Sequence, residues 1–153
     1  LAFRSDGLAA SVEHGPNTDD EVNALLPGNF GWDPGPGYDE GVPMTDLSKY
    51  PHAIEAIWSS GSPTIAPSGA DFLRGSQWGG RNGYLAVATL KASHLRLFLL
   101  TADDMYFGHV ERISNRGRLR APRQGPDGNL YVTTDGGSGG GEVLRVEPSA
   151  PPN

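Results

Sequence analysis

The stretch Gly125-Pro126-Asp127-Gly128-Asn129-Leu130-Tyr131-Val132-Thr133-Thr134 joins a tight turn to a run of strand-forming residues, and this combination recurs along the chain. Asp-Gly favours a hairpin, because glycine accepts the positive φ that tight turns need. The β-branched and aromatic residues after the turn are typical of a β-strand. The stretch therefore predicts one hairpin of an antiparallel sheet.

Similar strand groups occur three times. The expected strands are residues 1–3, 8–12, 21–26 and 54–58; then 68–73, 84–90, 94–100 and 109–113, with a turn at 79–83; then 118–123, 129–134 and 142–146. Repeated four-stranded antiparallel sheets are typical of propeller blades. We predict an all-β partial propeller over residues 1–147, with blades at about 1–60, 61–114 and 115–147, followed by a tail at 148–153. The third blade lacks its closing strand.

Composition supports this fold class and excludes several functions. Gly 22 and Pro 13 make up about a quarter of the 153 residues, which disfavours a helical bundle. A net charge of −6 provides no basic field for nucleic acid, and the sequence contains no run of apolar residues long enough to span a membrane. Zero cysteines exclude disulfides and thiolate metal sites.

The first residues, Leu1-Ala2-Phe3, already belong to a strand-like run and include no methionine. Complete propellers have typically about 4–8 blades, so three blades cannot close a ring. We therefore expect roughly the C-terminal half of a propeller, completed either by an N-terminal half or by a second copy of the chain.

Residues 13–23 form a polar loop with a Gly-Pro bend and four carboxylates. Oxygen donors on a bend suit a hard cation such as calcium, but a solvated acidic turn has the same composition. Both interpretations stay open on the residues alone.

Three cationic side chains and a histidine lie at expected strand ends. Alternation along a strand places Arg118 and Arg120 on one face, where paired guanidinium groups suit an anionic ligand or form a solvated edge. Lys91 and His14 each follow a strand at equivalent positions of neighbouring blades, so they are expected near the same mouth of the propeller. No common nucleophile or phosphate-binding motif is present in the sequence.

Together these motifs resemble one family, the soluble pyrroloquinoline-quinone (PQQ)-dependent glucose and aldose-sugar dehydrogenases, also called glucose/sorbosone dehydrogenases. The resemblance rests on Glu13-His14-Gly15-Pro16 with Asp19-Asp20-Glu21-Val22-Asn23, on Gly28-Asn29-Phe30-Gly31-Trp32, on Pro63-Thr64-Ile65-Ala66-Pro67-Ser68-Gly69, and on Gly117-Arg118-Leu119-Arg120 with the stretch that follows from Arg123. It implies a six-bladed β-propeller that holds PQQ on a calcium ion.

The resemblance also implies a set of site residues. It assigns the cofactor contacts to His14, Thr64, Lys91, Arg118 and Arg120. It assigns the calcium to the backbone oxygens of Gly15 and Pro16, and a second calcium, on a looser match, to Pro36, Tyr38 and Glu40. The carboxylates of Asp19, Asp20 and Glu21 then brace the loop by hydrogen-bonding its backbone.

The implied reaction moves a hydride from the anomeric carbon of an aldose to PQQ with calcium assistance, and an external acceptor then takes the electrons. The resemblance places the base histidine before Leu1, so we expect this chain to be inactive alone; Ala121 also replaces an expected aspartate. Periplasmic or secreted localisation is implied as well. The alternative is a non-catalytic propeller that binds a protein or glycan, as hedgehog-interacting relatives do.

Overall fold

The computed structural model describes residues 1–33, 41–101 and 106–148, and its regular structure is almost entirely antiparallel β-sheet. The strands are β1 (Ala2–Phe3), β2 (Ala9–Glu13), β3 (Glu21–Ala24), β4 (Trp58–Ser59), β5 (Pro67–Phe72), β6 (Leu85–Thr89), β7 (His94–Leu100), β8 (Tyr106–Ser114), β9 (Arg118–Gln124), β10 (Leu130–Asp135) and β11 (Val143–Val146). Two 3₁₀ helices, η1 (Ser76–Arg81) and η2 (Gly137–Gly139), complete the regular elements of these ranges.

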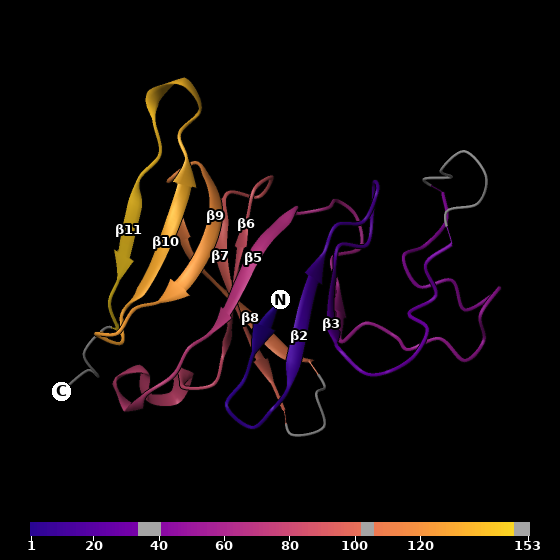
Figure 1. The fold of residues 1–153 in the computed structure, drawn as a ribbon. Coiled ribbons are helices and arrows are strands. Elements are labelled where there is room, and N and C mark those ends of the chain that lie inside the picture. The colour runs from indigo at the N-terminus through magenta and orange to yellow at the C-terminus, as the bar shows by residue number, and fades with distance from the viewer. Residues whose placement is uncertain (34–40, 102–105, 149–153) are drawn as a thin grey trace.

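The strands form three sheets that follow the chain in order (Figure 1). The sheet orders are β1-β2-β3-β4, then β5-β6-β7-β8, then β11-β10-β9. The predicted all-β class is confirmed, and the described strands form three antiparallel sheets. The predicted turn at 79–83 differs, because η1 occupies most of it and buries Trp78.

Two apolar clusters hold the sheets face to face. Val22, Phe72 and Phe98 belong to the cluster between the first and second sheets. Leu95, Leu119 and Val132 belong to the cluster between the second and third sheets. Side chains alternate between the two faces of a sheet, and the second sheet packs against the first sheet with one face and against the third with the other. Every residue of its strand β6 is therefore buried.

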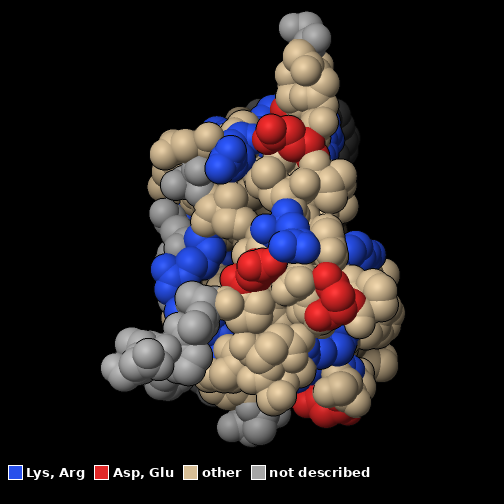
Figure 2. All heavy atoms as spheres, turned by 90° about the vertical axis from the view of Figure 1, so that its left-hand side faces the viewer, with Lys and Arg blue, Asp and Glu red and all other residues tan. Residues whose placement is uncertain are grey.

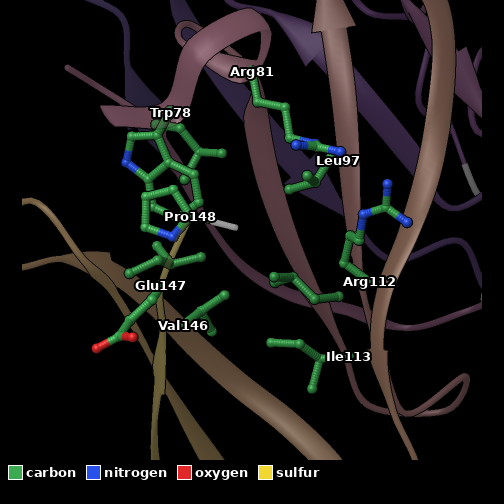
Figure 3. Close-up of a pocket in the computed structure, with 11 residues that line it drawn as sticks. Trp78, Arg81, Leu97, Arg112, Ile113, Val146, Glu147 and Pro148 are labelled. Atoms are coloured by element: carbon green, nitrogen blue, oxygen red, sulfur yellow. The ribbon is translucent and has the colours of Figure 1, made fainter. Parts of the chain in front are cut away.

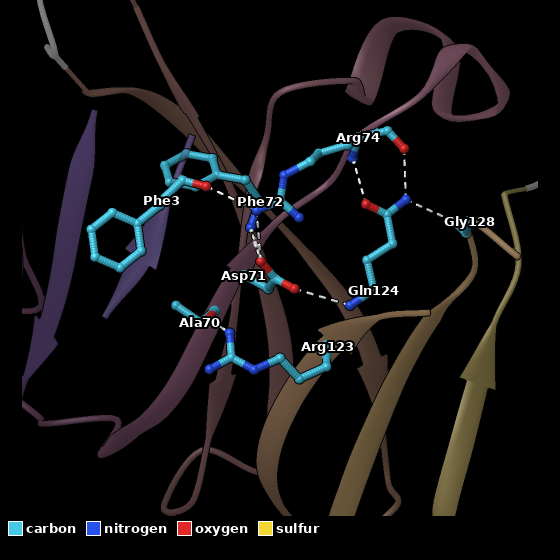
Figure 4. A network of polar contacts seen from close by, with 8 residues as sticks. All are labelled: Phe3, Ala70, Asp71, Phe72, Arg74, Arg123, Gln124 and Gly128. Atoms are coloured by element: carbon cyan, nitrogen blue, oxygen red, sulfur yellow. Dashed lines mark hydrogen bonds and ion pairs between the residues drawn. The ribbon is translucent and has the colours of Figure 1, made fainter. Parts of the chain in front are cut away.

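A buried aspartate adds polar contacts between the sheets. Asp71 of β5 accepts a hydrogen bond from the backbone N–H of Gln124 at the end of β9 (3.0 Å), and Arg74 pairs with Asp71 at 3.2 Å (Figure 4). Arg74 also donates to the carbonyl of Phe3 in the first sheet at 2.8 Å. One network therefore joins all three sheets, and it uses a charge-assisted bond at a buried acid.

On the face of the molecule formed by the third sheet, charged side chains of one sign do not predominate. Figure 2 shows acidic and basic side chains interspersed there, and the formal net charge is −6. No helix within the described ranges is long and apolar enough to cross a membrane.

Candidate cofactor site

Strand direction brings the predicted cofactor residues to one end of the three sheets. β2 and β6 end where β5 and β9 begin, because neighbouring strands are antiparallel and the inner strands of successive sheets lie side by side (Figure 1). His14 follows β2, Thr64 precedes β5, and Lys91 follows β6. Arg118 and Arg120 lie at the start of β9. Residues far apart in sequence thus lie at the same end of the three sheets.

The loop after β2 is held in shape by one buried carboxylate. Asp20 is 1% exposed and accepts three backbone N–H groups: Oδ1 from Gly15 at 2.9 Å, and Oδ2 from Ile65 at 2.5 Å and Ala66 at 2.6 Å. Two of these donors belong to the segment that carries Thr64. The carboxylate therefore fixes the Gly15-Pro16 bend after β2 relative to the segment that leads into β5.

Gly15 has no room for a side chain. A Cβ at this position would lie 1.7 Å from the carbonyl oxygen of Thr18 and 2.7 Å from the carbonyl carbon of Asp19. Both obstacles are backbone atoms, which cannot swing aside. The bend thus requires glycine at position 15, because the backbone approaches closely there.

The neighbouring acids act differently from the prediction. Glu21 hydrogen-bonds two side chains, Asn23 at 3.2 Å and Thr45 at 3.1 Å, rather than the loop backbone. Burial raises the pKa of Glu21 above its usual value, and the Coulombic field of Glu13 acts in the same direction. Asp19 accepts hydroxyl bonds from Thr18 and Ser59. Only Asp20 of the three braces the loop backbone through its side chain, because only its carboxylate faces the next sheet.

His14 is positioned by a bond to the second sheet. Its Nε2 lies 2.6 Å from the carbonyl oxygen of Pro67, which can only accept, so Nε2 carries the proton. The ring is exposed, and its position beside the start of β5 places it next to the segment that holds Thr64.

Thr64 and Lys91 meet directly. The Lys91 Nζ donates to the Thr64 Oγ1 at 2.7 Å, although 27 positions separate the two residues. The lysine is exposed and the threonine half-buried. The pair offers an ammonium group and a hydroxyl side by side, which suits an anionic oxygen of a ligand.

Arg118 and Arg120 share one exposed face of β9, while Leu119 between them is fully buried, as strand alternation predicts. Asp135 at the end of β10 lies 2.5 Å from Arg120 and 3.9 Å from Arg118. The hydrogen bond from Arg120 holds the pKa of Asp135 below its usual value. One carboxylate thus offsets part of the charge of two guanidinium groups.

Ser68 is a positioning residue that sequence reasoning gave no role. Its hydroxyl lies 2.8 Å from the carbonyl oxygens of both Leu119 and Arg120, and 3.1 Å from that of Ala88. It therefore sets the distance between β5 and the arginine-bearing strand. The sequence indicates Ser68 only as a member of the motif at residues 63–69. No local pattern predicts which strand its hydroxyl contacts.

Metal-binding groups are sparse in the part of the chain that the structure describes. No cluster of three or more histidine, aspartate or glutamate side chains there could hold a metal ion. The carbonyl oxygens of Gly15 and Pro16 accept no hydrogen bond from a described residue. Pro36, Tyr38 and Glu40, predicted for a second calcium, lie outside the described residues.

Comparisons with known proteins identify one family. A family model described as Glucose / Sorbosone dehydrogenase matches residues 1–145. Aldose sugar dehydrogenase YliI of Escherichia coli is 32% identical over 146 residues, covering 89% of this chain and 37% of the relative. Quinoprotein glucose dehydrogenase B of Acinetobacter calcoaceticus is 33% identical over 94 residues, covering 59% of this chain and 19% of the relative.

Solved structures show the same architecture. A structure titled glucose dehydrogenase superposes with a TM-score of 0.78 at 29% identity, covering 98% of this chain and 43% of that one. The PQQ-bound aldose sugar dehydrogenase of Streptomyces coelicolor superposes with a TM-score of 0.67 at 23% identity, covering 96% of this chain and 42% of that one, and shows the shared fold. The chain spans less than half the length of these proteins. By its sequence match and its fold, it belongs to the glucose/sorbosone dehydrogenase family.

Proposed function

We propose that this chain forms part of the PQQ site of a PQQ-dependent sugar dehydrogenase that oxidises the anomeric carbon of aldoses. The observation that carries the proposal is the convergence of His14, the Thr64–Lys91 pair and two arginines of β9 at one end of three sheets. Family membership supports the same chemistry, and the relatives named above are dehydrogenases.

The donor set fits a quinone that carries three carboxylates. Lys91, Arg118 and Arg120 provide three positive charges, and Asp135 offsets one of them. A guanidinium group offers a planar fork that matches a carboxylate, while an ammonium group acts as a compact point charge. When bound, PQQ would supply a two-electron acceptor. The residues of this chain would hold and orient it.

Among the residues that the structure describes, backbone oxygens are the groups that would hold the first calcium. The carbonyls of Gly15 and Pro16 would be the ligands, because the nearby Asp20 already satisfies three backbone donors. Two neutral oxygens are fewer than the six to eight that calcium typically takes, so about four or more would come from elsewhere. The second calcium on Pro36, Tyr38 and Glu40 stays a prediction.

The remaining elements of the function are also proposals. The base histidine is expected outside this sequence, so the contribution of this chain to catalysis is binding and orientation. Family membership supports the aldose, an external electron acceptor and periplasmic or secreted localisation as proposals. A completing half or a second copy is proposed because three sheets cannot close a propeller ring. The dehydrogenase names of the relatives favour this role over that of a non-catalytic binding propeller.

Titration of the chain with PQQ in the presence of calcium tests the proposal. Saturable quenching of protein fluorescence is expected, and Arg120→Gln should weaken the affinity by about tenfold or more, because a charged hydrogen-bond donor is lost. Arg145→Gln is a matched control, since Arg145 is an exposed strand arginine that pairs with Glu147 away from this mouth. Equal affinity of both variants, or no binding by the unmodified chain, would count against the proposal.

A further inference from the structure

A second concave site lies between the second and third sheets and shares no residue with the proposed cofactor site. It is a partly open cavity of about 220 Å³, bounded by η1, β7, β8, β10, β11 and the residues after β11 (Figure 3). Its walls include Leu73, Trp78, Leu95, Leu97, Leu130 and Val146.

The size and walls of this cavity suit a small apolar group. An apolar cavity of roughly 150 Å³ is large enough to take up benzene, and such cavities stay free of water when their walls are aliphatic or aromatic. Leu73, Leu95 and Leu130 are almost fully buried, and the Trp78 ring is 7% exposed. The indole N–H of Trp78 already donates to the Gly128 carbonyl at 3.0 Å, so the ring offers an apolar surface rather than a donor.

The charges at the rim are asymmetric. Figure 3 shows the guanidinium groups of Arg81 and Arg112 on the same side of the cavity, opposite Trp78 and Pro148. The acid at the rim, Glu147, pairs with Arg145 at 2.5 Å. Among the described residues, none forms an ion pair or side-chain hydrogen bond with Arg81. An anion is therefore the complementary ligand.

We propose that this cavity binds a small carboxylate with an aromatic or branched aliphatic body, of about the size of benzoate. The body fills the space between Trp78 and Leu97, and the carboxylate pairs with Arg81. A partly desolvated guanidinium group beside an apolar wall strengthens such a pair, because the local dielectric is low. The site does not depend on the proposed cofactor function.

Sodium benzoate and its neutral analogue benzamide are suitable probes, since they share one shape and differ in charge. NMR of the ¹⁵N-labelled chain follows the three tryptophan indole N–H signals, and Trp78→Phe identifies that of Trp78. Benzoate should shift the Trp78 signal along a saturable curve, with a dissociation constant on the order of 1 mM for a ligand this small. Trp32 and Trp58 should not respond, because they lie outside the cavity.

Variants separate the charge from the apolar contact. Arg81→Gln should weaken benzoate about tenfold and change benzamide affinity less than about twofold, as expected for one charge-assisted pair. Leu97→Trp, which fills the cavity, should remove binding of both probes. Arg116→Gln is the matched charge control, because Arg116 is exposed and outside the cavity lining.

Two results would overturn the proposal. One is an unmoved Trp78 signal at 20-fold the expected dissociation constant, which is about 20 mM benzoate. The other is equal weakening of benzoate by Arg81→Gln and Arg116→Gln, which would show a non-specific charge effect. If Leu97→Trp does not fold, the comparison of the two arginine variants still tests the proposal, because Arg81 is only half-buried and Arg116 is exposed.

Discussion

Replacing Asp20 with asparagine should destabilise the protein more than any other single-atom change in the loop at residues 13–23. The carboxylate is 1% exposed and accepts three backbone N–H groups, one from the loop after β2 and two from the segment before β5. Asparagine keeps the shape of the side chain but has one acceptor oxygen and no charge. At least one of the three donors must lose its acceptor.

The magnitude follows from the three bonds. If the amide oxygen keeps Ile65 and Ala66, the NH₂ group faces the N–H of Gly15, and one buried donor is left unsatisfied. That costs about 1–3 kcal/mol, and loss of the charge weakens the two remaining bonds by about 1 kcal/mol. We expect a loss of about 3 kcal/mol in unfolding free energy, or a fall of about 6–12 °C in Tm for a chain of this size.

Urea unfolding and calorimetry measure this loss, with Asp19→Asn as control. Asp19 accepts only two hydroxyl bonds and has a φ of 62°, a conformation that asparagine tolerates well, so its variant should stay within about 0.5 kcal/mol. Asp20→Asn should also weaken PQQ binding, because the bend would lose its tie to the segment carrying Thr64. If both variants unfold at the same urea concentration, the bracing role assigned to Asp20 is wrong.

Three further changes test the same region. Gly15→Ala should lower Tm by about 5 °C or more in a thermal scan, since its Cβ would overlap a backbone oxygen; an unchanged Tm would mean that the bend relaxes freely. Glu21→Gln should stabilise the protein at pH 7, because the burial that raises the Glu21 pKa favours the neutral form. The gain in unfolding free energy should vanish below pH 4.5, where Glu21 is protonated in both the folded and the unfolded state. A pH series of urea titrations measures it, and a loss of stability at pH 7 would contradict the prediction. Asp135→Asn should strengthen PQQ binding several-fold in the fluorescence titration, as it frees the two arginines of β9 from their carboxylate; weaker binding would show that Asp135 orients them instead.

The fold was largely predictable because its signals are local. Alternating apolar residues and Asp-Gly turns mark hairpins, and a hairpin pairs strands that are neighbours in sequence. The predicted strand 129–134 corresponds to β10 at Leu130–Asp135, and 94–100 to β7. The helix η1 was not predicted, because its glycine-rich sequence looks like a plain turn, and its stability comes from Trp78 packing between two sheets.

The sequence by itself determined the strand order, the exposed face shared by Arg118 and Arg120, and the family motifs, because each depends on residues close together in the chain. Only the tertiary structure decided which groups meet. It brought Thr64 into contact with Lys91 and placed two backbone donors of the segment before β5 at Asp20. It also placed Glu21 against side chains rather than against the loop backbone. Such contacts depend on how one sheet lies against the next. That packing is set by the shape of two buried apolar clusters whose members span most of the chain, so no local pattern records it.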